Sequence, residues 1–262
     1  MLRQQDITSR LTTASLGRSI LTLEELESTN QTLLQLADAA PEGMIVTCET
    51  QSAGRGRHRR LWHSPPGQNL YFSMMLRPRV SRMRLPQIAM LAAVALHRML
   101  RIVAPEMQCR LKWPNDVWCG ERKLSGILCE CPPAKGDEAA IVLGIGINVN
   151  SRQEDFPEEL HSIATSMAIA AGHRFQREMV LAEFVNEFEA VYKQWQQEEN
   201  LAFISGYWQA NDLLKDRKIA LTALDVPMTG TVTGYTPEGL MLLQTEDGTV
   251  RTISAGDVHL KL

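Results

Sequence analysis

A glycine- and arginine-rich segment early in the chain combines the residue types that hold anionic groups. Residues 51–62 read QSAGRGRHRRLW and contain four arginines: Arg55, Arg57, Arg59 and Arg60. Arginine presents a planar fork of donors that matches carboxylate and phosphate oxygens, and Gly54 and Gly56 allow the backbone to lie close to a ligand. The whole chain has a formal net charge of −3, so this positive charge is local. The segment predicts an anion-binding loop, with a merely solvated basic loop as the alternative.

A lysine in an apolar run provides another cation. Lys123 lies in residues 122–128, RKLSGIL, which have the composition of a strand. Burying an ammonium without an anionic partner is costly, so we expect a ligand carboxylate or phosphate beside Lys123. The preceding residues 112–116, KWPND, predict a turn, because a residue before proline is extended and Asn and Asp side chains bond nearby backbone amides. A turn by itself needs no function.

Two further polar motifs bear on ligand binding. Residues 27–30, ESTN, predict the start of a helix, where free N–H groups can bind a polar ligand. Ser28 followed by Gln31 has the spacing of a capping box. Residues 144–148 read GIGIN, but Val149 replaces the third glycine of a dinucleotide-binding fingerprint, and the chain has no Walker A sequence. A nucleotide would therefore bind without either standard phosphate cradle.

The segments around these motifs predict a mixed α+β architecture. Apolar and β-branched runs predict strands at residues 44–49, 69–76 and 139–150 and on both sides of Gly120. Apolar residues at helical spacing predict helices from residue 28 to a stop at Pro41 and Gly43, over 85–103, and over 176–211 with a break near Asn200. The first twenty or so residues are polar with weak periodicity and are interpreted as an arm.

The composition changes near Asp212, where short alternating runs replace the longer segments. Proline and glycine separate these runs, and Asp247-Gly248 is a hairpin signal. Regular short strands of this kind predict a small β-barrel of about fifty residues. We therefore divide the chain into a catalytic domain, residues 1–212, and a C-terminal β domain, residues 213–262.

Composition also excludes several protein classes. An apolar content of 44% and a charged content of 22% are typical of globular proteins, and the charge balance creates no field for nucleic acid or an anionic membrane. The most apolar segment, residues 88–96, is too short to cross a bilayer, and residues 1–20 contain no continuous apolar run that would predict a signal peptide. Five cysteines without a CxxC pair favour reduced thiols in the cytoplasm. Cys129 and Cys131 have no second ligand pair, so they predict no metal site.

Six motifs in a fixed order carry a resemblance to a known family. They are ESTN, QSAGRGR, W-x-S-P-x-G-x-N-L-Y, KWPND, R-K-L-x-G-I-L-x-E and GIGINVN. This series closely resembles biotin protein ligases, which attach biotin to biotin-dependent carboxylases, and the match extends from about Thr22 to the C-terminal domain. The resemblance implies an α+β fold: a biotin/lipoate ligase-like mixed sheet flanked by helices, then a small C-terminal SH3-like β-barrel.

The resemblance also implies an activity. Such an enzyme forms biotinoyl-5′-AMP from biotin and ATP with Mg²⁺, and transfers biotin to a lysine of the biotin carboxyl carrier protein of acetyl-CoA carboxylase or a related carboxylase. ATP with Mg²⁺ and biotin are then substrates, no tightly bound prosthetic group is expected, and no metal ligand in the chain is certain. The N-terminus is too short for the winged-helix DNA-binding domain of bifunctional members, so we expect no nucleic-acid partner. Homodimerisation is left open.

Site residues carry over motif by motif. Biotin binding would involve Ser28, Thr29, Asn30, Gln51, Gly54, Arg55, Gly56, Arg57 and Lys123. ATP binding would involve Arg55, Arg57, Arg60, Trp62, Asn115, Lys123 and Asn148. Arg57 and Lys123 would act in catalysis by neutralising the biotin carboxylate and the α-phosphate, and Asp116 would orient or deprotonate the acceptor amine. Arg59 departs from the family, in which this position often holds a glycine.

Two other functions fit parts of the pattern. A lipoate or octanoate ligase has a related fold and also modifies a protein lysine, and the acid that supports ATP–pyrophosphate exchange would distinguish it. A non-catalytic biotin-sensing regulator would bind biotin tightly without any exchange activity.

Overall fold

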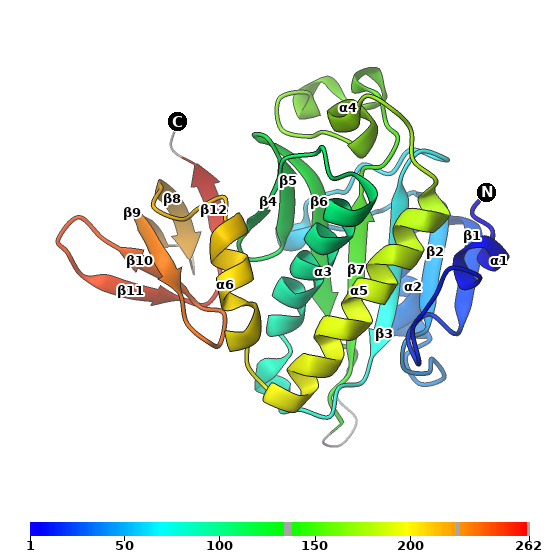
Figure 1. The fold of residues 1–262 in the computed structure, drawn as a ribbon, viewed down its shortest axis with the longest axis horizontal. Coiled ribbons are helices and arrows are strands. Elements are labelled where there is room, and N and C mark those ends of the chain that lie inside the picture. Colours follow the sequence, from blue (N-terminus) through cyan, green and yellow to red (C-terminus); the bar gives the residue numbers. More distant parts are fainter. Residues whose placement is uncertain (134–137, 224–225, 261–262) are drawn as a thin grey trace.

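A seven-stranded sheet organises the larger part of the protein (Figure 1), in a computed structural model that describes residues 1–133, 138–223 and 226–260. The strand order is β1-β2-β3-β7-β6-β5-β4. The strands are β1 Ile20–Leu26, β2 Ile45–Gln51, β3 Leu70–Leu76, β4 Cys109–Lys112, β5 Asp116–Cys119, β6 Arg122–Glu130 and β7 Ile141–Ile147. β1 pairs with β2 in parallel and the other neighbours pair antiparallel. The predicted mixed sheet is confirmed.

Buried apolar side chains lie on both faces of this sheet. Successive side chains on a strand point to opposite faces, so Met74 and Leu143 join the larger apolar core whereas Met75 and Val142 join a smaller one. Two long helices, α3 (Gln87–Val103) and α5 (Arg177–Glu198), cover the face with the larger core (Figure 1). The short helix α2 (Thr29–Gln35) contributes Leu33 to the other face.

Aromatic rings along α5 form much of the larger core. Phe184, Phe188, Tyr192 and Trp195 stack in sequence with centroid separations of 5.5–5.9 Å, because residues three or four apart lie on one helix face. A second helix, α6 (Ala202–Asn211), follows after a break, as predicted. The short helices α1 (Gln4–Thr8) and α4 (Met167–Ala171) were not predicted. In the described part of the chain no helix is both long enough and apolar enough to cross a membrane.

The C-terminal strands form a separate antiparallel sheet in the order β11-β10-β9-β8-β12. They are β8 Lys218–Ala223, β9 Val226–Tyr235, β10 Met241–Gln244, β11 Val250–Ile253 and β12 Asp257–Leu260. The predicted hairpin at Asp247-Gly248 joins β10 to β11. This small β unit is confirmed, and it lies beside α6 and β4 (Figure 1). The division at residue 212 stays a prediction.

Two predictions about α2 were wrong. Ser28 is the N-cap but makes no capping bond through its side chain, and Gln31 donates to Glu27 at 3.3 Å instead of closing a capping box. The helix ends at Gln35 rather than near Pro41. The intervening residues form a turn, in which Ala37 and Ala40 are buried in the smaller core.

The first twenty residues, interpreted as an arm, pack against α5. Leu16 is fully buried, and the Glu189 carboxylate on α5 accepts backbone N–H groups of Ala14, Ser15 and Leu16 at 2.7–3.0 Å. This segment is attached through its backbone N–H groups, which any residue type can provide. Its side chains therefore show only a weak hydrophobic periodicity.

Replacing Glu189 by glutamine tests this attachment. Burial alone would raise the pKa of Glu189, but hydrogen bonds from Lys193 and the three backbone N–H groups outweigh burial and lower the pKa to about 2. The carboxylate therefore stabilises the fold at neutral pH, and this contribution is lost as the pH falls from about 4.5 toward 2. We expect Glu189→Gln to lower the free energy of unfolding by about 2 kcal/mol at pH 7, measured by urea denaturation.

The same measurement at pH 3 should show a smaller difference between Glu189→Gln and wild type, since the unfolded carboxyl is then mostly protonated. Glu183→Gln, on the same helix, is the control and should change stability little at either pH. A difference of the same size at pH 7 and pH 3 would contradict the charge-based attachment.

Candidate active site

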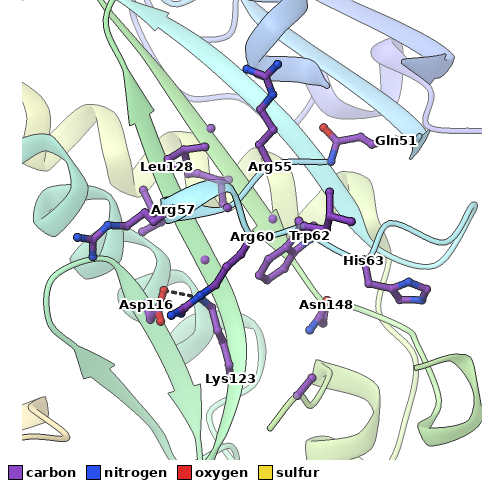
Figure 2. A pocket seen from close by; sticks show the side chains of 18 of the residues that line it. Gln51, Arg55, Arg57, Arg60, Trp62, His63, Asp116, Lys123, Leu128 and Asn148 are labelled. Carbon is purple, nitrogen blue, oxygen red and sulfur yellow. Dashed lines mark ion pairs between the residues drawn. The ribbon is translucent and has the colours of Figure 1, made fainter. Parts of the chain in front are cut away.

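The arginine-rich loop and the two central strands enclose one cavity. We call residues 51–62 the clasp; it leads from β2 toward β3. The cavity has a volume of about 270 Å³ and is shown in Figure 2. The predicted site residues that line it are Ser28, Thr29, Asn30, Gln51, Arg55, Gly56, Arg57, Arg60, Trp62, Asn115, Asp116, Lys123 and Asn148. The structure thus brings together residues from all six motifs.

Gly54 shapes the clasp rather than lining the cavity. A side chain at Gly54 would place its Cβ 2.7 Å from the carbonyl oxygen of Trp62 and 2.9 Å from Nε2 of Gln51. The Trp62 N–H donates to the Gly54 carbonyl at 2.9 Å, so the clasp folds back on itself there. The side chain of Arg59, the departure from the family pattern, lies outside the described part of the chain.

Glycines on β7 and β6 make the floor of the cavity. A Cβ at Gly144 would lie 1.9 Å from Oδ1 of Asn30, and one at Gly146 would lie 2.4 Å from the Trp62 indole. A Cβ at Gly126 would lie 3.0 Å from the same ring. The glycines of GIGIN therefore make room for the side chains of Asn30 and Trp62. This accounts for the glycines in a motif that is not a dinucleotide-binding fingerprint.

One end of the cavity is lined by the neutral polar side chains of Thr29, Asn30 and Gln51. The Thr29 backbone N–H donates to Oε1 of Gln51 at 2.9 Å. Oγ of Ser73 lies 2.8 Å from Oγ1 of Thr29 and 2.5 Å from Oδ1 of Asn30. Ser73 was missed from the sequence; its signal is a small polar side chain in the wholly buried strand β3. This end can exchange hydrogen bonds with a neutral polar ligand group.

The other end of the cavity is cationic. Nζ of Lys123 lies 2.7 Å from Oδ1 of Asp116 and 5.6 Å from the centroid of the Trp62 ring. Asp116 therefore supplies an anionic partner for Lys123 within the protein itself, and the ligand anion expected beside Lys123 stays a prediction. Nη1 of Arg57 donates to Oδ1 of Asn115 at 3.2 Å. Figure 2 shows Arg60 between Arg57 and Lys123, directed toward Asp116.

Two predicted residues have other partners. Arg55 points away from Lys123 in Figure 2, and its Nη2 donates to Oε1 of Gln31 at 2.6 Å. Nδ2 of Asn148 donates to the Thr165 carbonyl at 3.0 Å, so this amide also holds the loop that precedes α4. Both side chains line the cavity, but neither is directed at the Lys123–Asp116 pair.

An apolar wall of the cavity was missed by sequence reasoning. Phe156, Leu160 and Ile163 line the cavity from the segment between β7 and α4. His63 connects this segment to the clasp, since its Nε2 lies 2.9 Å from the Asp155 carbonyl oxygen. No regular pattern marks these residues, because they lie in short turns whose path depends on the rest of the fold.

Comparison with known proteins identifies relatives of this arrangement. A family model described as "Biotin/lipoate A/B protein ligase family" matches residues 23–148, and one described as "Biotin protein ligase C terminal domain" matches residues 216–261. The chain is similar to "Bifunctional ligase/repressor BirA" of Bacillus subtilis, with 34% identity over 260 residues, covering 99% of this chain and 79% of that protein.

Two further comparisons cover nearly the whole chain. A "Biotin--[acetyl-CoA-carboxylase] ligase" of Mycobacterium tuberculosis is 28% identical over 267 residues, covering 99% of this chain and 96% of that protein. The structure titled "Biotin protein ligase from Aquifex aeolicus in complex with biotin and ATP" superposes with a TM-score of 0.81 and 28% identity, covering 93% of this chain and 100% of that one.

Adding a methyl group to the floor should destabilise the protein through one contact. Gly146→Ala places a Cβ against the Trp62 indole, and we expect the free energy of unfolding to fall by about 1–3 kcal/mol through overpacking. If that contact is responsible, Gly146→Ala should cost much less in a Trp62→Ala background, as a double-mutant cycle by urea denaturation would show. Gly206→Ala is the control, since nothing lies within 4 Å of the added atom. Equal costs in the two backgrounds would contradict the contact.

Proposed function

The chain belongs to the biotin protein ligase family, and on this basis we propose that it joins biotin to ATP as biotinoyl-5′-AMP and then transfers biotin to a protein lysine. One observation carries the proposal: a single cavity has a neutral polar end at Thr29 and Gln51 and a cationic end at Arg57 and Lys123. Biotin has the matching ends, a neutral ureido ring and a carboxylate. Ser28, Asn30 and the clasp glycines complete the biotin site in this proposal.

In the first step the biotin carboxylate attacks the α-phosphorus of ATP and pyrophosphate leaves. Both reactants are anions, so cations must offset their repulsion and stabilise charge that develops on the phosphoryl group. We assign this role to Arg57 and Lys123, with Arg60 beside them. The hydrogen bond from Arg57 to Asn115, which is itself buried, fixes one of these cations before the substrates arrive.

The nucleotide would occupy the side of the cavity between Trp62 and Asn148. The indole offers a flat apolar surface, and the polar groups near Asn115 and Asp116 would face the phosphates. Mg²⁺ would arrive as part of the ATP complex, since the described residues contain no group of three or more His, Cys, Asp or Glu side chains that could hold a metal ion. The clasp would then exclude water from the reactive acyl-adenylate.

In the second step a lysine amine attacks the acyl carbon and AMP leaves. An ordinary lysine with a pKa near 10.4 is neutral in only about one molecule in 2,500 at pH 7, a cost of about 4.6 kcal/mol. Asp116 is the motif carboxylate at this end of the cavity. Its contact with Lys123 favours a role in placing that cation, and its action on the acceptor amine stays a hypothesis that the Asp116→Asn experiment below tests.

The acceptor in this proposal is a lysine of a biotin carboxyl carrier protein. The relatives named as acetyl-CoA-carboxylase ligases support this choice. A cytoplasmic location, the lack of a nucleic-acid partner and the oligomeric state remain predictions. The alternatives are distinguished by ATP–pyrophosphate exchange with biotin, lipoate and octanoate: exchange with biotin alone supports the proposal, and exchange only with the other acids contradicts it.

Removing either catalytic cation should abolish most of the first step. We expect Lys123→Ala and Arg57→Ala each to lower biotin-dependent ATP–pyrophosphate exchange a hundredfold or more, which corresponds to about 3 kcal/mol of lost transition-state stabilisation. Lys218→Ala and Arg79→Ala are charge-matched controls in exposed positions and should exchange like wild type. Exchange within a few-fold of wild type would remove the tested residue from the active centre.

Asp116→Asn separates the two roles of that carboxylate. If Asp116 places Lys123, the variant should slow exchange and carrier biotinylation by the same factor, about tenfold or more, because both depend on the first step. If Asp116 acts on the acceptor amine, exchange should stay near wild type while transfer from preformed biotinoyl-5′-AMP to a carrier domain falls. Measuring both reactions on one preparation decides between them.

A further inference from the structure

Glu130, at the end of β6, contacts both the polar end of the cavity and the clasp. Its Oε2 accepts a hydrogen bond from Nδ2 of Asn30 at 2.7 Å, and its Oε1 lies 4.0 Å from Nη1 of Arg55. The side chain is 29% exposed, so the carboxylate is partly shielded from water.

The contact with Glu130 decides which face of the Asn30 amide can meet a ligand. Nδ2 of Asn30 donates to Glu130 and, at 3.2 Å, to the Leu128 carbonyl. A side-chain amide has two N–H donors, so both are in use. Oδ1 lies 2.5 Å from Oγ of Ser73 and keeps a second lone pair. Asn30 is therefore fixed as a hydrogen-bond acceptor, suited to an N–H group of a ligand.

The same carboxylate holds the clasp through Arg55. The guanidinium of Arg55 lies between Gln31 on α2, at 2.6 Å, and Glu130 on β6. These contacts draw Arg55 away from the cationic end of the cavity (Figure 2). The loop that carries Arg57 is thereby tied to α2, which contributes Thr29 and Asn30 to the polar end, and to the end of β6.

We propose that Glu130 is a positioning residue that sets Asn30 as an acceptor for the ureido N–H of biotin and ties the clasp to that binding pocket through Arg55. This inference rests on the proposed function for the identity of the ligand. The contact between Glu130 and Arg55 is independent of the proposed function, because it forms without any ligand. Glu130 acts through Asn30 and Arg55 and touches no reacting atom.

Two substitutions separate these contacts in the full-length protein. Glu130→Ala removes both, and we expect it to raise KM for biotin in ATP–pyrophosphate exchange about tenfold to a hundredfold, with kcat and KM for ATP within about threefold of wild type. Glu130→Gln keeps an oxygen acceptor for Asn30 but loses the charge that attracts Arg55. It should recover most of the loss in biotin KM.

Limited trypsin digestion tests the contact between Glu130 and Arg55 in the absence of any substrate. Both variants keep every arginine of the clasp, so the cleavage sites are unchanged. We expect both to be cut in the clasp several-fold faster than wild type, and Glu24→Gln, an exposed control on β1, to be cut at the wild-type rate. The cleavage position is identified by mass spectrometry of the fragments.

Each outcome has a distinct meaning. A biotin KM that rises equally in Glu130→Ala and Glu130→Gln, or in neither, would overturn the assignment for Asn30. Wild-type cleavage rates in both variants would overturn the tie to Arg55. A uniform loss of kcat with little change in KM would indicate a loss of folded enzyme rather than positioning. Failure of wild type to exchange with biotin would defeat the proposed function, and the digestion would still test the tie.

Discussion

The site depends on gathering positive charge in a small cavity before an anion is present to neutralise it. Arg57, Arg60 and Lys123 line the same space, and like charges at such separations repel one another. The protein offsets this cost with Asp116 at 2.7 Å from Lys123 and with the amide oxygen of Asn115 on Arg57. These contacts offset part of the repulsion between the cations, and two anionic substrates would offset the rest on binding.

The central strands need glycines as well as apolar residues where they form the floor of this cavity. Gly144 and Gly146 on β7 leave the volume that Asn30 and the Trp62 indole occupy. The surrounding positions of β7 remain buried and branched, which preserves the sheet pairing with β3 and β6. β7 therefore packs most of its side chains in the core, and its two glycines leave room for the side chains that line the cavity.

The C-terminal sheet contacts the cationic end of the cavity, although the two are far apart in the sequence. The carbonyl oxygen of Gly256, between β11 and β12, lies 3.5 Å from Nη1 of Arg57, and Nε1 of Trp113 donates to the Gly239 carbonyl at 3.0 Å. Trp113 belongs to the turn that also presents Asn115 and Asp116. The placement of Arg57 and of the turn beside it therefore depends on contacts with the second, C-terminal sheet.

By itself the sequence determined the elements and the residue types of the site, because both depend on local information. Apolar runs located β2, β3, β7, α3 and α5, and six ordered motifs supplied most of the polar residues that line the cavity. Only the tertiary structure decided how these residues pair. A register shift between Val117 and Trp118 accompanies the contact of Asp116 with Lys123, and sheet order brings Glu130 to Asn30, one hundred residues away. Such contacts depend on the three-dimensional path of the chain, which leaves no periodic trace in the order of its residues.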